Sequence, residues 1–195
     1  MIDFEVSTGR VQIMKADYLQ NLNDAVEQIE RQKTFSEIVE GLKKELNYSE
    51  EPFVWSVLDL GSVNCAMPDR IKSGWVFVLK RDVPSWRHYH PNSVQHMVMI
   101  EGQGQSCVGN LRKEMVRFGT PGQPLETVWY VINEGVPHEF FPENAEMVVV
   151  SFHTCEAREL EEVACGQAPN GCIWVNKSTL SRGARTIWDR KKRSE

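Results

Sequence analysis

The chain has 195 residues, a length that suits one domain with a terminal extension. Its hydrophobic content of 41% and charged content of 25% are ordinary for a globular protein, and the formal net charge of -5 argues against nucleic acid as the main partner. No apolar run approaches the ~20 residues that a membrane-spanning helix requires, so we expect no membrane partner. The first residues resemble no secretory signal, and the cysteines form no C-x-x-C pair, so we expect a cytoplasmic protein with reduced thiols.

Residues 1–50 have the apolar spacing of helices. Apolar side chains recur at three- and four-residue steps, first through Met14, Tyr18, Leu22, Val26 and Ile29, and then through Phe35, Ile38, Val39, Leu42 and Leu46. Thr34 and Glu37 have the spacing of a capping box. We therefore predict an N-terminal helical extension of two amphipathic helices joined near Lys33, which bury their apolar stripes on the rest of the domain or on another subunit.

From residue 52 the pattern changes to short runs rich in Val, Ile, Trp and Phe. These runs cover residues 53–60, 75–80, 95–101, 105–108, 127–132 and 146–152. Turn residues separate them, and Gly109-Asn110 is expected to turn one hairpin. Short strands divided in this way are typical of a β-sandwich or barrel, so the fold is predicted to be mainly β.

The C-terminal part, residues 156–195, is expected to differ from the strands before it. Residues 156–164 are acidic and predict a short helix, and residues 172–175 predict an extra strand. Arginines and lysines gather in the last residues, from Arg182 to Arg193. We interpret them as a solvated basic tail rather than a nucleic-acid site.

Histidines in two separate segments are the strongest functional signal. His88 and His90 are two residues apart, so on an extended chain both rings point to the same side. His138 follows a turn that contains Gly135, and it can approach from a neighbouring strand. Three neutral imidazoles that converge on one point form a site for a divalent first-row metal ion, with coordination positions left open for chemistry.

The first histidine segment resembles the first motif of the cupin superfamily. His88 and His90 occupy the two histidine positions of that motif, and Gly102 is its final glycine. Gln95 stands where the family has a glutamate ligand, and Asp82 replaces the leading glycine. The spacing on both sides of the histidines is intact.

The second histidine segment resembles the second cupin motif. Gly135 and His138 match it, whereas Thr127, Asn133 and Pro142 stand at its other defining positions. The positions that depart from the two motifs are mostly turn residues, apart from the missing acidic ligand.

The resemblance implies a cupin-like double-stranded β-helix, or jelly-roll barrel, over residues 51–155, preceded by the helical pair. It implies one divalent metal ion on His88, His90 and His138, with Gln95 as the fourth ligand or as a hydrogen-bond donor near the ion. Iron(II) is the expected metal, with manganese, nickel or zinc as alternatives, because imidazoles accept all of them. Cupins commonly dimerise, so a homodimer is expected, with a small molecule as substrate.

Gln95 bears directly on the expected reaction. Glutamine is neutral, so three imidazoles and Gln95 leave the charge of a divalent ion uncompensated, which favours an anionic or enolisable substrate. Diketone and thiol dioxygenases of the superfamily resemble this arrangement, and we expect a non-haem Fe(II) dioxygenase. Manganese-dependent hydroxynitrile lyases, with glutamine as the fourth ligand, make a redox-neutral lyase or isomerase the first alternative. A cupin that binds a small molecule without catalysis is the second.

Three further residues enter the expected site. His96 is adjacent to Gln95 and faces the opposite side unless the strand slips by one residue, in which case His96 would replace Gln95 at the metal. His153 is a candidate general base, with a purely structural role as the alternative. Tyr130 is a candidate proton donor if its side chain points inward.

Overall fold

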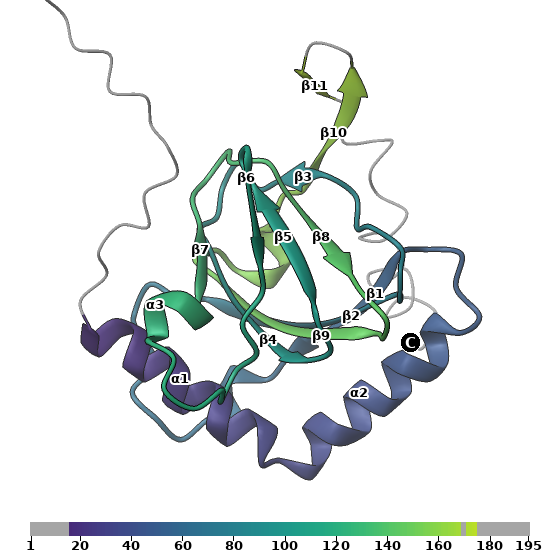
Figure 1. Ribbon diagram of the computed structural model, residues 1–195. Coiled ribbons are helices and arrows are strands. Elements are labelled where there is room, and N and C mark those ends of the chain that lie inside the picture. The colour runs from purple at the N-terminus through teal and green to yellow at the C-terminus, as the bar shows by residue number, and fades with distance from the viewer. Residues whose placement is uncertain (1–15, 169–170, 175–195) are drawn as a thin grey trace, which may run out of the picture.

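The computed structural model describes residues 16–168 and 171–174. The described part of the chain begins with two helices, α1 (Ala16–Glu30) and α2 (Lys33–Leu46), which lie on one side of the strands (Figure 1). The predicted helical pair is therefore present. Within these residues, no helix combines the length and the apolar character that crossing a membrane would need.

The predicted capping box at Thr34 and Glu37 is wrong. Helix α2 begins at Lys33, its N-cap is Gln32, and no side chain caps it. Only two residues separate the helices, so the carbonyl oxygen of Gln32 already accepts bonds from the backbone N–H groups of Phe35 and Ser36. Thr34 consequently lies inside the first turn, where its side chain cannot act as an N-cap.

The strands form two sheets. The first has the strand order β1-β2-β9-β4-β7, with bounds β1 (Phe53–Leu58), β2 (Ser73–Leu79), β9 (Met147–His153), β4 (Gln95–Glu101) and β7 (Tyr130–Ile132). The second has the order β11-β10-β3-β8-β5-β6, with bounds β11 (Gly171–Trp174), β10 (Val163–Ala168), β3 (His88–Tyr89), β8 (His138–Pro142), β5 (Gly104–Val108) and β6 (Leu111–Glu114). All of these strand pairs are antiparallel, which is the arrangement of a jelly roll.

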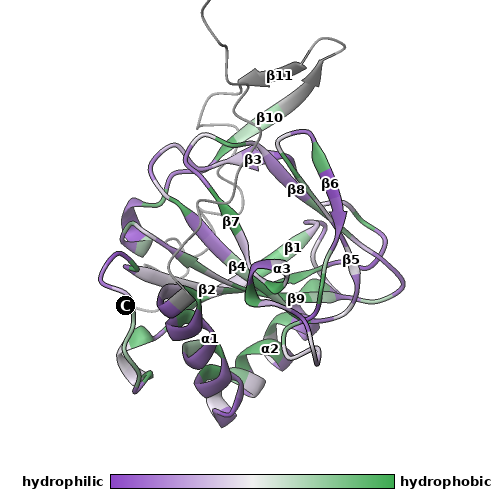
Figure 2. Cartoon of the chain, turned by 60° about the vertical axis from the view of Figure 1, so that its left-hand side comes forward, coloured by the Kyte–Doolittle hydropathy of each residue, from purple (hydrophilic) through white to green (hydrophobic). Residues whose placement is uncertain are grey.

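Alternating side chains decide which face of the first sheet meets the helices. On β9, Val148, Val150 and Phe152 belong to the hydrophobic cluster that includes α1 and α2, whereas Met147 and Val149 belong to a second cluster between the sheets. Both faces of β9 are covered, so every residue of this strand is buried. Figure 2 shows hydrophilic residues over much of the outward surface of the two helices. The helices thus bury their apolar stripes on this chain's own sheet.

Several strands match the sequence prediction, and two segments do not. Strand β4 has the predicted bounds, and Gly109-Asn110 joins β5 to β6 as expected. The run 127–132 is only partly a strand, because residues Leu125–Val128 form the short helix α3, in which the Thr127 and Val128 N–H groups donate to the carbonyl oxygen of Pro124.

The predicted acidic helix over residues 156–164 is wrong. A single 3-10 turn, η2 (Ala157–Glu159), is followed by strand β10 from Val163. Asn92 holds the backbone between them, since its side chain donates to the carbonyl oxygen of Glu159 and accepts from the N–H of Glu161. These backbone groups are therefore satisfied outside a helix. The predicted extra strand corresponds to β11, and the basic tail lies outside the described residues.

Candidate metal centre

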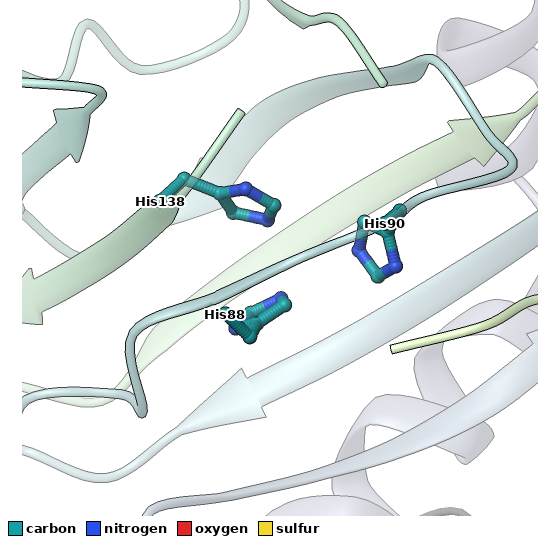
Figure 3. A group of neighbouring side chains, drawn as sticks. All are labelled: His88, His90 and His138. Carbon is teal, nitrogen blue, oxygen red and sulfur yellow. The ribbon is translucent and has the colours of Figure 1, made fainter. Parts of the chain in front are cut away.

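Three histidine side chains from the second sheet and the segment after β3 lie close together (Figure 3). His88 on β3 lies directly opposite His138 on β8, and His90 follows β3. The ring centroid of His88 is 4.3 Å from that of His138 and 5.1 Å from that of His90. One nitrogen from each ring lies within 4.8 Å of the others, and all three residues are buried. The structure thus brings together the histidines that the two sequence motifs supplied.

Backbone carbonyls orient all three imidazoles in the same way. The Nδ1 atoms donate to the carbonyl oxygens of Trp86, Glu161 and Val136, at 2.8 Å for His88, 2.9 Å for His90 and 3.0 Å for His138. A carbonyl oxygen only accepts, so each Nδ1 carries the proton and each Nε2 presents a lone pair. Such hydrogen bonds are the usual orienting partners of metal-bound histidines.

Burial favours the neutral form, which a metal requires, in two of these rings. It lowers the pKa of His90 to about 4, and the neighbouring His88 acts in the same direction. Burial also lowers the pKa of His138 well below its usual value. The Nε2 atom of His138 is buried and has no hydrogen-bond partner in the protein. A buried polar atom without a partner is costly, and a cation at the centre of the three rings would satisfy it. The donor set therefore fits a divalent ion.

Gln95 faces the same interior as the histidines. Its Nε2 donates to the hydroxyl oxygen of Ser151 at 3.0 Å, which leaves its buried Oε1 without a partner. His96 points to the opposite face of β4, where its Nε2 lies 3.4 Å from the hydroxyl of Tyr18 on α1. Between the two alternatives from the sequence, Gln95 is therefore the residue on the same side of β4 as the histidines, and its role at a metal stays a prediction.

His153 and Tyr130 occupy different surroundings. His153 is fully buried beside His90, with ring centroids 5.0 Å apart, and its two ring nitrogens contact the hydroxyls of Ser93 and Ser151 at 3.2 and 3.1 Å. Tyr130 donates its hydroxyl proton to the carbonyl oxygen of Glu114 at 2.9 Å. This bond directs Tyr130 toward β6, whereas His153 connects through Ser151 to Gln95. General-base and proton-donor roles for these two residues stay predictions.

Glu162 is a neighbour of the centre that the sequence did not point to. Its Oε2 lies 3.8 Å from Nε2 of His88, and its side chain lines the same cavity. The acidic stretch 156–164 predicts a short helix, and that prediction gives no reason to place Glu162 beside the histidines. No motif spacing connects Glu162 to the histidines, and the residues that follow it, Val163, Ala164 and Cys165, form no pattern that marks its position.

An apolar cavity opens beside the histidines. Its walls are mostly aromatic and aliphatic, and they include Phe53, Trp55, Trp75, Phe77, Trp86, Met97 and Phe140. The polar part of its lining contains His88, His90 and Gln95. Arg158, whose side chain is largely exposed, is the one guanidinium or ammonium group among the described lining residues. Apolar walls with a few convergent polar groups are typical of small-molecule sites.

No family model and no curated protein matches the chain, so solved structures supply the comparison. Two structures of the salicylate 1,2-dioxygenase from Pseudoaminobacter salicylatoxidans are similar to it. One, a variant, has a TM-score of 0.51 and 10% identity over 68% of this chain and 39% of that chain. The other, a different variant in complex with gentisate, has a TM-score of 0.50 and 12% identity over 68% of this chain and 37% of that chain.

A recombinant oxalate oxidase in complex with glycolate is more distant, with a TM-score of 0.44 and 15% identity over 70% of this chain and 67% of that chain. The chain thus spans well under half the length of the dioxygenase chains. At these identities the likeness shows the fold alone. The neighbours are cupins, so the predicted fold class is confirmed: this chain has a cupin-like, mainly β fold preceded by a helical pair.

Proposed function

We propose that this chain is a metal-dependent enzyme that acts on a small molecule, with a non-haem Fe(II) dioxygenase as the leading reaction class. The observation that carries the proposal is the set of three buried imidazoles whose Nδ1 atoms are held by backbone carbonyls, with one nitrogen of each ring within 4.8 Å of the others. Manganese, nickel and zinc remain alternatives, because imidazole ligands alone do not select among these ions.

Different side chains of the protein would bind the ion, orient a reactant and hold a proton. His88, His90 and His138 would hold it, and a bound divalent metal would supply Lewis acidity and open coordination positions for reactants. Gln95 would orient a reactant through its cavity-facing amide, because Ser151 holds the other end of that amide. The hydrogen-bonded path from Gln95 through Ser151 to His153 would hold a proton close to the reacting atoms.

The cavity supports a substrate with an apolar body and an anionic or enolisable head. Phe53, Trp75 and Phe77 would pack on the body and exclude water. Arg158 at the open side would attract negative charge, and the uncompensated charge of the ion would bind it. Structural neighbours that are named dioxygenases favour oxygen chemistry over the redox-neutral alternative.

Metal analysis of untagged protein tests the centre. We expect about one divalent ion per chain in the wild type, and none in His88→Ala or His138→Ala, because each substitution removes one of the three ligands. His96→Gln is the matched control, since it replaces a buried histidine on the far face of β4 and should leave the metal content unchanged. Metal retained equally by all four proteins would contradict the proposed centre.

Oxygen uptake then distinguishes the reaction classes. Wild-type protein reconstituted with Fe(II) is tested with salicylate, gentisate, a 1,3-diketone and a small thiol, in air and without oxygen. Uptake that disappears in His138→Ala supports the dioxygenase. Turnover that persists without oxygen would instead assign the redox-neutral lyase or isomerase, and ligand binding without turnover would assign a binding protein. The expected homodimer stays a prediction, which sedimentation equilibrium can check.

A further inference from the structure

The segment between η2 and β10 is bonded to the histidine pair from the side opposite β8. Val163 and Ala164 of β10 pair with Tyr89 and His88 of β3. The carbonyl oxygen of Glu161 accepts from Nδ1 of His90, so the segment also orients a candidate ligand. These bonds hold residue 162 beside the centre.

Glu162 brings a carboxylate to the open side of the three imidazoles. Its Oε2 is 3.8 Å from Nε2 of His88, the atom that the Trp86 carbonyl leaves free for a ligand. Two ligand atoms that share one ion at bond lengths of ~2.1 Å are about 3 to 3.5 Å apart, close to this separation. The Glu162 side chain is also partly shielded, at 28% exposed, and it lines the cavity next to His90 and Gln95.

A divalent ion bound by neutral ligands alone would favour a nearby carboxylate. His88, His90 and His138 are neutral when they coordinate, and Gln95 occupies the position where the first cupin motif would carry an acid. A divalent ion on these groups alone would keep its full charge in a largely apolar cavity, which is unfavourable. A carboxylate in contact with the ion would reduce the net charge by one.

We propose that Glu162 is an additional ligand of the metal ion, so that a carboxylate from outside both histidine segments takes the place of the acid missing at Gln95. This inference rests on the proposed metal centre. The ligand set becomes three imidazoles and one carboxylate, with Gln95 left free to contact the substrate through its Oε1. It also accounts for a neutral residue, Gln95, at the position where the first motif would carry an acid.

Binding of Co2+ to metal-free, full-length protein tests the proposal without any need for turnover. Co2+ lies close to iron in the affinity series of first-row ions, and a chelator dye reports its dissociation constant by competition. We expect Glu162→Gln to weaken Co2+ binding about 10- to 100-fold, the size of effect known for groups that tune metal ligands. The visible Co2+ bands should also shift, because the substitution exchanges a charged oxygen ligand for a neutral one.

Glu156→Gln is the matched control, because it removes the same charge from an exposed position of the same acidic stretch. We expect it to bind Co2+ within twofold of the wild type. Glu162→Ala gives the same measurement should Glu162→Gln fail to fold. Wild-type affinity and unchanged bands in the Glu162 variants would overturn this inference.

His88→Ala separates this inference from the proposed function. Loss of Co2+ binding in His88→Ala together with wild-type binding in Glu162→Gln leaves the metal centre standing and removes only Glu162 from it. Wild-type binding in His88→Ala, or no Co2+ binding by the wild type, would overturn the centre and this inference together.

Discussion

Acidic pH should weaken the contact between the helical pair and the sheet through one buried histidine. His96 lies on the face of β4 that meets α1, where it is 2% exposed and its ring centroid is 5.4 Å from that of Tyr18. Burial lowers the pKa of His96 to about 4, and the positive charge of Arg70 acts in the same direction. The folded protein therefore keeps this ring neutral at pH values where an unfolded chain protonates it.

The size and sign of the effect follow from this difference. The folded pKa of about 4 lies below the unfolded value of 6.5, so the unfolded state binds the extra proton between these values. Stability is fully present above the unfolded pKa and is lost as the pH falls toward the folded pKa. At about 1.4 kcal/mol per pKa unit, His96 costs about 2 kcal/mol of unfolding free energy between pH 7 and pH 5, and about 3 kcal/mol in total.

Urea unfolding of the metal-free protein at pH 7 and pH 5 measures this effect. Burial also lowers the pKa of His90, His138 and His153, so these residues favour unfolding in acid too, but they are present in both proteins that are compared. We expect the unfolding free energy of His96→Gln to fall by about 2 kcal/mol less than that of the wild type over this interval. An equal fall in the two proteins would refute the assignment of His96 as a buried neutral ring.

Two further substitutions test the interior and its turns. Gln95→Glu should bind Co2+ at least tenfold more tightly, or about 1.4 kcal/mol, because it adds a negative charge beside the ion. Its metal-free form should lose stability in urea, because a buried carboxylate then lacks a counter-charge. Unchanged Co2+ affinity would contradict the inward position of Gln95. Gly102→Ala should lower the unfolding free energy by roughly 1–3 kcal/mol, since Gly102 has a φ of 92° and a Cβ there would stand 2.4 Å from the backbone oxygen of Glu146. The control Gly109→Ala also changes a glycine of positive φ, but its added Cβ meets open space, so it should lower the unfolding free energy less. Equal losses in the two variants would show that the close approach at Gly102 does not contribute to stability.

The strands of the first sheet were predictable because each of their faces packs against an apolar layer, which requires a continuous apolar run in the sequence. Strand β4 places Met97 and Met99 in the interior cluster and Val98 and Ile100 under the helices, so its apolar run continues until Glu101 and Gly102 end it. The histidines were predictable for a different reason: His88 and His90 share a face at an i, i+2 spacing, and His138 matches the second motif.

The C-terminal segment was not predictable from local pattern. Its acidic residues favour a helix in isolation, yet Asn92 holds its backbone and Arg87 accepts from the N–H of Cys165 through its carbonyl oxygen. These partners are more than sixty residues away in the chain, so no local periodicity records them. Tertiary contacts override helix propensity here, and the same override places Glu162 in the cavity.

The weakness of strand β3 explains why this segment belongs to the site. β3 is only His88–Tyr89, and a strand of two residues cannot hold two imidazoles in place by its own pairing with β8. Pairing with β10 supplies a second neighbour, and the Glu161 carbonyl fixes the ring of His90. Two successive residues thus serve both imidazoles: the backbone of Glu161 orients His90, and the side chain of Glu162 faces the free nitrogen of His88. One short segment outside both histidine motifs therefore orients the ring of His90 and supplies a carboxylate beside His88. The arrangement of the three histidines thus depends on residues that neither motif contains.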